Sequence, residues 1–450
     1  MEGDAVVNAL HSGRPRPVEG DDDDDDDNDE EKKSHDHDHD AVGSGNRRPR
    51  PPPPGGKLLT IDQALGACGT GRFQYQLLVI AGLAFCGDAI EVMFLSFLSP
   101  CVQAAWGLTN LEAASIASVV FAGELVGSAV LGSLADTHGR RPIFIAACLI
   151  IFLSGLLSCV ATSYGFLLAT RAVVGFGVGG LAVPFELLAE FLLPETRGKF
   201  LLLVEVFWTL GSCYTALWAW AILNSAGWRW LALVCALPVL LVLFVVPLVP
   251  ESPRWLMLQN RTDEAAAIIV RVAKINGNER QLPSDFRLDA AGRARTSNSH
   301  FKPSLLVSTP ALRRITCLLF LVWAGFGAGY YGVILFITKL FQEGDDGGAS
   351  SEECRFDYPS IFVSSTSEIV GLAWAMLLLD RRGRRFTQAC FYSTASFFTF
   401  LLGFRSGVGM LTVCAFLARA GAMAASCATW VRSKPSCSST NKKINRMRQI

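Results

Sequence analysis

Long apolar stretches alternate with polar segments along most of the chain, from about residue 77 onward. Each apolar stretch is close to the roughly 20 residues that a helix needs to cross a bilayer. In lipid every backbone amide needs an internal partner, so these stretches are expected to be helices. The predicted spans are 77–101, 113–135, 143–161, 165–188, 200–223, 230–250, 315–341, 359–379, 387–404 and 408–431. The pattern therefore predicts an all-α membrane protein with ten spans.

The longest internal polar segment separates six spans from the remaining four. The predicted parts are a cytoplasmic tail at 1–57, a six-helix half at 58–250, a cytoplasmic central loop at 251–314, a four-helix half at 315–431 and a polar tail at 432–450. The first tail contains the acidic run Asp21–Asp27 and alternating His and Asp from His35 to Asp40. It buries nothing to offset its ordering entropy and is expected to be disordered. Weak metal binding by the His-Asp run is the alternative to a solvated acidic tail.

Composition and charge narrow the class of protein. Hydrophobic residues make up 51% of the chain and charged residues only 18%, with a mean hydropathy of +0.35. The net charge of zero is the sum of an acidic tail and a basic body. Residues 1–57 hold 16 acidic and 8 basic side chains, and the remainder holds 24 acidic and 32 basic ones, a net charge of +8. A basic, very apolar body indicates a multi-pass protein in a lipid bilayer and argues against nucleic-acid binding.

The basic residues of the loops predict the orientation, because cytoplasmic loops carry an excess of Lys and Arg. The segment 251–314 carries 11 of them, whereas 342–357 has six acids and only Arg355. The N-terminus and the central loop are therefore expected in the cytoplasm, and 342–357 outside or in a lumen. No sorting signal decides between the plasma membrane and an endomembrane vesicle.

The 13 cysteines give no sign of a metal site or a redox motif, since no Cys-x-x-Cys pair occurs. Most lie in apolar runs, where a thiol behaves as a small hydrophobe. Cys354 lies alone in a polar loop and is expected to be a free thiol. Neither a resident metal nor a cofactor is expected.

An internal repeat links the two groups of spans. Leu134–Arg141 matches Leu378–Arg385 at a distance of 244 residues, and Arg171-Ala172 matches Arg419-Ala420 at a distance of 248. Both matches are in register with the spans. They indicate two homologous halves, an organisation typical of transporters whose halves rock about a central site.

Four motifs resemble known transporters. Gly132-x-x-x-Asp136-x-x-Gly139-Arg140-Arg141 resembles the loop signature of the major facilitator superfamily. Pro250–Leu256 resembles a motif shared by its sugar porters and organic ion transporters. Gly87–Met93 and the glycine-rich stretch that follows Arg171 are similar to the synaptic vesicle 2-related and niacin transporter-like group. The resemblance implies the major facilitator fold with twelve spans, so the second half is expected to be incomplete.

The resemblance also implies a cytoplasmic gate. A charge network there would hold the cytoplasmic side shut when formed, with Asp136 pairing with an arginine across the two halves. The expected gate residues are Gly132, Asp136, Gly139, Arg140, Arg141, Glu190, Arg197, Glu251, Arg254, Asp380, Gly383 and Arg384. Simple loop topology with positive-inside charge is the alternative interpretation.

Ionisable residues inside the spans predict the transport site, because a charge at bilayer depth is costly unless it faces a cavity or a partner. Asp88 and Glu91 are three residues apart and share a helix face. With Arg171 they are expected to face a central cavity, one acid exchanging a proton and the arginine binding that acid or a substrate carboxylate. A purely structural buried ion pair is the alternative. Tyr330 and Tyr331 are the preferred aromatic cavity residues, and further mid-span acids are Glu124, Glu205 and Glu368.

These observations predict a secondary active transporter, such as a proton symporter, for a small organic ion. The ion would be a nicotinate-like carboxylate or an organic cation, moved by alternating access in a monomer. The chain has no nucleotide-binding loop and no catalytic constellation, so an enzyme is not expected. A sugar porter and a non-transporting, truncated or regulatory membrane protein are the alternatives.

Overall fold

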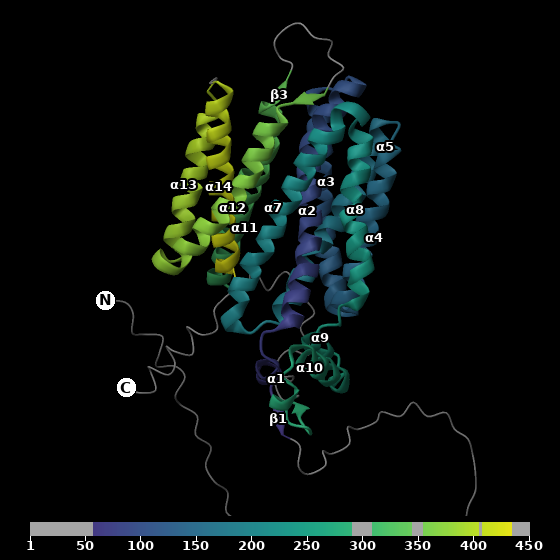
Figure 1. Ribbon diagram of the computed structural model, residues 1–450, viewed down its shortest axis with the longest axis vertical. Coiled ribbons are helices and arrows are strands. Elements are labelled where there is room, and N and C mark those ends of the chain that lie inside the picture. The colour runs from purple at the N-terminus through teal and green to yellow at the C-terminus, as the bar shows by residue number, and fades with distance from the viewer. Residues whose placement is uncertain (1–56, 290–307, 344–353, 405–406, 434–450) are drawn as a thin grey trace, which may run out of the picture. The chain divides into compact units, whose positions relative to one another are not determined.

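The computed structural model describes residues 57–289, 308–343, 354–404 and 407–433. The first tail with its His-Asp run lies outside this part of the chain except for Lys57, and the polar tail lies outside it beyond Ser433. Figure 1 shows the described residues as a bundle of long helices with a small helical group beneath its lower end.

The first half supplies the six expected spans as long helices. They are α2 (Arg72–Trp106), α3 (Asn110–His138), α4 (Arg140–Cys159), α5 (Tyr164–Val178) continued through η1 (Gly179–Leu181) into α6 (Ala182–Glu190), α7 (Pro194–Ala226), and α8 (Trp228–Val245) with η2 (Val246–Leu248). Local sequence sets several boundaries. Thr109 and Glu112 form a capping box at the start of α3, and Pro194 opens α7.

The central segment is not a featureless loop. It contains α9 (Pro253–Leu258), α10 (Thr262–Asn276), η3 (Glu279–Gln281) and β2 (Arg287–Leu288), and it meets β1 (Leu58–Leu59) and α1 (Ile61–Cys68) from the start of the described chain. β1 and β2 pair in parallel, and α10 packs against α1 and α9. α10 buries an apolar face that includes Ile269 and Val272. Burial also raises the pKa of the Cys68 thiol to about 11.

The second half contains four long helices and a short hairpin. They are α11 (Pro310–Leu340), β3 (Gln342–Glu343), β4 (Arg355–Phe356), α12 (Tyr358–Arg382), α13 (Arg384–Leu401) and α14 (Val408–Ser433). Among the described residues, nine helices are long and apolar enough to span a membrane. α13 occupies the place of the remaining predicted span, but its arginines and hydroxyl side chains leave it less apolar than the others.

The repeated loop motif takes the same backbone conformation in both halves. Gly139, between α3 and α4, has φ +106°, and Gly383, between α12 and α13, has φ +80°. These angles suit glycine, which has no Cβ to clash. The two matching sequences therefore form two matching helix turns.

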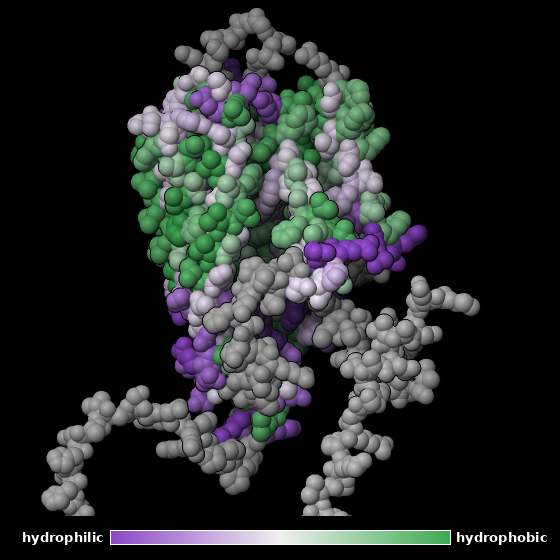
Figure 2. All heavy atoms as spheres, turned by 180° about the vertical axis from the view of Figure 1, so that it is seen from behind, coloured by the Kyte–Doolittle hydropathy of each residue, from purple (hydrophilic) through white to green (hydrophobic). Residues whose placement is uncertain are grey.

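One buried apolar cluster joins the halves. Its members include residues of α2, α3, α7 and α8 in the first half and of α11, α12, α13 and α14 in the second. Figure 2 shows hydrophobic side chains over much of the helical part of the molecule, with hydrophilic ones below it and at its upper end, as expected of a bundle surrounded by lipid. We call the end that carries Gly139 and Gly383 the motif end and the opposite end the disulfide end.

The disulfide end corrects one prediction. Cys354 is not a free thiol: it is bonded to Cys101, 253 residues earlier in the sequence. The chain folds back through α11 and the β3–β4 hairpin, which brings Cys354 to the end of α2.

Candidate functional site

Most of the predicted gate residues lie together at the motif end. Arg140 is at the centre of this group: its guanidinium lies 2.5 Å from Asp136 and 3.4 Å from Glu190, and 3.9 Å from Glu186. Asp136 therefore pairs with the arginine four residues later and not with one across the halves. All four residues belong to the first half.

Glu251 has a different role from an ion-pair partner. Its carboxylate accepts hydrogen bonds from the backbone N–H groups of Arg140, at 2.8 Å, and Arg141, at 3.2 Å. It thus caps the N-terminus of α4, where a negative charge is favourable. A Cβ at Gly139 would lie 2.5 Å from the same carboxylate, so this glycine leaves room for the cap.

The other predicted gate residues are arranged more loosely. Arg254 donates to the carbonyl of Glu190 and lies 2.5 Å from Asp62 on α1, while Arg197 donates to the carbonyl of Leu192. Among the described residues, no neighbour lies within 4 Å of a Cβ placed at Gly132. In the second half, Gly383 forms the turn described above, and the side chains of Asp380 and Arg384 lie outside the described atoms. A gate that closes between the halves remains a prediction.

A large cavity opens between the halves. Its volume is about 730 Å³, and it is lined by residues of α2, α3, the α5–α6 span, α7, α11 and α14. Glu186, beside Arg140, lines both this cavity and a shallower hollow at the motif end. The cavity thus extends from the middle of the bundle toward the motif end.

The polar lining of this cavity is acidic. Asp88, Glu124, Glu186 and Glu205 contribute carboxylates, and no lysine, arginine or histidine among the described residues lines it. We call Asp88, Glu124 and Glu205 the cavity carboxylates. None of the ion pairs among the described residues involves them, and no donor in that part of the chain reaches Oδ1 of Asp88.

Aromatic rings form one wall of the cavity. Tyr331 lies at the centre of this wall, with ring-centroid distances of 5.1 Å to Phe121, 5.7 Å to Tyr330 and 6.2 Å to Trp208. Trp208 is buried, and among the described residues its indole N–H has no acceptor. Aromatic rings and carboxylates thus line the same cavity, which is a setting that suits a positive charge.

The remaining predicted site residues form a closed ion pair. Arg171 lies 2.9 Å from Glu91, donates through Nε to Ser158, and stands over the ring of Phe94. Arg171 is 1% exposed and neither partner lines the cavity. Of the five predicted cavity residues, Asp88, Tyr330 and Tyr331 therefore line the cavity, whereas Glu91 and Arg171 neutralise each other beside it.

A second buried pair lies in the other half. Arg419 donates through Nε and Nη2 to the same oxygen of Glu368, at 3.2 and 2.8 Å, and through Nη1 to Ser365. Tyr330 also donates to Glu368, at 3.1 Å. The sequence marks Arg419 as the repeat of Arg171 and Glu368 as a mid-span acid, but no local pattern predicts that they pair. Among the described residues, no cluster of His, Cys, Asp and Glu has the arrangement of a metal site.

Comparisons with known proteins agree with this architecture. Residues 61–440 match the family described as sugar (and other) transporters. The chain is 34% identical over 376 residues to the synaptic vesicle 2-related protein of Pongo abelii, covering 80% of this chain and 67% of that protein. It is 32% identical to organic cation/carnitine transporter 7 of Arabidopsis thaliana, with 76% and 75% covered. The inward-open structure of the xylose transporter XylE from E. coli shares the fold, with a TM-score of 0.60, 18% identity, and 80% of this chain and 82% of that one covered.

Proposed function

Because this chain belongs to the sugar (and other) transporter family of the major facilitator superfamily, we propose that it moves a small organic cation across a membrane by alternating access. The family makes it a membrane transporter and not an enzyme. The observation that carries the proposal is the acidic cavity, which has four carboxylates and no basic side chain in its described lining. An apolar cavity with this charge attracts cations and repels anions.

The two buried arginines favour a cation over a nicotinate-like carboxylate. An anionic substrate would need a free cationic group, but Arg171 and Arg419 are each paired with an acid and about 1% exposed. Breaking a buried pair leaves an uncompensated charge and costs about 3–5 kcal/mol. A sugar has no charge with which to satisfy the cavity carboxylates, so the sugar porter is the less favoured alternative.

Proton coupling follows from the same carboxylates. Ionised acids in an apolar cavity are costly unless a proton or a cation neutralises them. Asp88 has the strongest need, because it is buried and Oδ1 lacks a donor among the described residues. A substrate cation and a proton would compete for these acids, so we expect exchange of one for the other in place of the symport expected from sequence.

The disulfide supports an orientation. Disulfides persist in oxidising compartments and are rare in the cytosol. We therefore place the disulfide end outside the cell or in a vesicle lumen, and the motif end with the N-terminus in the cytoplasm. The name of the synaptic vesicle 2-related relatives favours a vesicle membrane.

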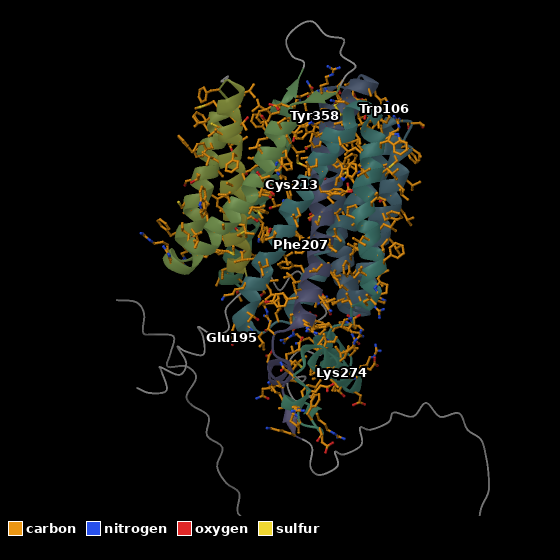
Figure 3. All side chains as sticks on the ribbon, in the orientation of Figure 1. Trp106, Glu195, Phe207, Cys213, Lys274 and Tyr358 are labelled. Atoms are coloured by element: carbon orange, nitrogen blue, oxygen red, sulfur yellow. A yellow bond between two sulfur atoms is a disulfide. The ribbon has the colours of Figure 1, made fainter. Side chains whose placement is uncertain are left out.

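An uptake screen with proteoliposomes tests the proposal. We expect accumulation of tetraethylammonium driven by a pH gradient, and little of nicotinate or a hexose. Glu124→Gln and Asp88→Asn should each lower uptake by about tenfold or more, because a hydrogen bond or contact to a charged group contributes about 1.5–3 kcal/mol. Glu195→Gln is the matched control, since Glu195 lies exposed at the motif end, away from the cavity (Figure 3).

Two results would contradict this assignment. Uptake of nicotinate or hexose in preference to the cation would show that the cavity carboxylates do not select the substrate. The absence of uptake of all three by correctly inserted protein, both before and after its disulfide is reduced, would favour the non-transporting alternative.

A further inference from the structure

The disulfide end holds a covalent link between the two halves. Cys101 lies near the end of α2 in the first half, and Cys354 directly precedes β4 in the second. The other ten described cysteines are unbonded. The single disulfide among the described cysteines therefore crosses the interface that a carrier must open.

Noncovalent contacts close the same end around this bond. Thr338 on α11 donates to Ser96 on α2 at 3.0 Å, and both hydroxyls are buried. Tyr358, labelled near the upper end of α12 in Figure 3, donates to Asn224 on α7 at 2.7 Å. These contacts also join the first half to the second. The disulfide therefore links the halves at an interface that is already closed by noncovalent contacts.

Small molecules have a route to the bond. A pocket of about 280 Å³ is lined by both cysteines together with Asn224, Trp228 and Arg355. Cys354 is half-buried, whereas Cys101 is almost completely buried. The sulfur of Cys354 is thus the accessible one, and the arginine in the pocket wall favours an approaching thiolate.

We propose that Cys101–Cys354 is a redox site that locks the carrier closed at its disulfide end, and that a small dithiol entering this pocket releases the lock. A thiolate of the dithiol attacks the sulfur of Cys354, forms a mixed disulfide and displaces Cys101 as a thiolate, which takes up a proton. The second thiol of the reagent then displaces Cys354 and closes the reagent's own disulfide. The protein gains two electrons and two protons, and the reagent loses them.

The lock has a geometric basis. The Cα atoms of the two cysteines are 5.1 Å apart, and a disulfide cannot join Cα atoms more than about 7 Å apart. Alternating access requires the halves to separate at this end by more than that margin, so the oxidised carrier exposes its cavity only toward the motif end. This inference rests on alternating access in the proposed function, but it does not depend on which substrate is carried.

Labelling of an introduced cysteine tests the lock without a substrate. Thr338→Cys places a thiol at the closed interface, where Thr338 is fully buried, and an impermeant maleimide is added on the side of the disulfide end. We expect several-fold more labelling after treatment with dithiothreitol, and equally in the Cys101→Ser background without it. Ser225→Cys, at the exposed end of α7, should label alike in all states. The unsubstituted chain and Cys101→Ser alone supply the blanks for the two backgrounds, because reduction or the loss of Cys101 also frees the thiol of Cys354.

The outcomes separate the lock from the transport proposal. Equal labelling of Thr338→Cys in the oxidised and reduced states would overturn the lock, whether that labelling is high or low. If reduction increases labelling but no organic cation is taken up, the lock stands and the substrate assignment fails. If both hold, dithiothreitol should increase cation uptake by the unsubstituted chain and leave that of Cys101→Ser unchanged.

Discussion

The two halves hold a buried arginine on the same scaffold. In the first half a Cβ at Gly123 would lie 2.3 Å from the carbonyl oxygen of Ala172, and in the second a Cβ at Gly371 would lie 2.2 Å from that of Ala420. In each half the arginine directly precedes this alanine. Close backbone packing of two helices at a glycine therefore fixes the position of Arg171 and of Arg419 alike.

The halves differ in the acid that each arginine meets. Glu368 lies three residues before Gly371 on α12 and pairs with Arg419, whereas the corresponding residue on α3 is Val120. Arg171 pairs instead with Glu91 of α2. In the second half the arginine on α14 thus pairs with an acid on α12. In the first half the acid lies on α2, where Asp88, one turn before Glu91, lines the cavity. The first arginine is therefore connected to the cavity through Glu91 and α2, and the second through Glu368 and Tyr330, which lines the cavity.

The largest expected effect comes from removing the second arginine. Arg419→Leu leaves Glu368 completely buried without its cation, and such a loss costs about 3–5 kcal/mol. We expect the largest fall in the thermal unfolding midpoint of the purified protein among all the variants named here. Arg171→Leu should cost less, because Glu91 accepts one hydrogen bond from its arginine whereas Glu368 accepts two.

The double variant Arg419→Leu with Glu368→Leu provides the control. Replacing both partners with apolar side chains removes the unpaired charge, so much of the lost stability should return. A double variant as unstable as the single one would show that the ion pair is not the cause.

Next in size is the close contact of the helices. Gly123→Ala and Gly371→Ala each force a methyl group against a backbone carbonyl, and overpacking of this kind costs about 1–3 kcal/mol. The two variants should lower the unfolding midpoint to a similar extent, since the two distances nearly agree. Unequal effects would mean that only one half relies on this packing.

The sequence predicted the part of this comparison that depends on local composition. Hydropathy is a property of consecutive residues, so the spans and the repeated turn at Gly139 and Gly383 could be predicted. The partner of Arg419 could not be predicted. The repeat nevertheless indicated that the halves differ, because the loop motif recurs after 244 residues whereas the arginine recurs after 248. The stretch from the packing glycine to the loop glycine is therefore four residues shorter in α12 (Gly371 to Gly383) than in α3 (Gly123 to Gly139). Four residues make about one helical turn, or about 6 Å.

Partners that are distant in the sequence were beyond prediction for a different reason. The spacing of cysteines does not define their connectivity. Cys101 and Cys354 meet only because the two halves pack together, which no local pattern encodes. Likewise, Glu205 and Trp208 could be recognised as mid-span residues, but their place in the cavity depends on how α7 is rotated against α2 and α12.

A smaller, more specific effect would come from making the first half resemble the second. Val120→Glu introduces a carboxylate where α12 carries Glu368, so Arg171 should gain a second available partner. In this background Glu91→Gln should lose less stability than it does alone, by about 1–2 kcal/mol, within the range of coupling between contacting residues. Additive losses in unfolding experiments would show that the two glycine contacts do not place their arginines equivalently.

The smallest expected effect concerns Gly132 of the loop motif, which tests whether the motif is needed for packing. Among the described residues, a Cβ at Gly132 meets no atom within 4 Å. A Cβ at Gly123, on the opposite face of the same helix, would lie 2.3 Å from the carbonyl oxygen of Ala172. Alanine favours the helix over glycine by about 0.5–1 kcal/mol, so Gly132→Ala should leave stability unchanged or raise it slightly. If uptake nevertheless falls, Gly132 must approach another surface when the motif end closes, since in the present arrangement it approaches none among the described residues. Unchanged uptake with unchanged stability would instead remove Gly132 from the predicted gate and leave Arg140 and its acidic partners as the part of the motif that matters.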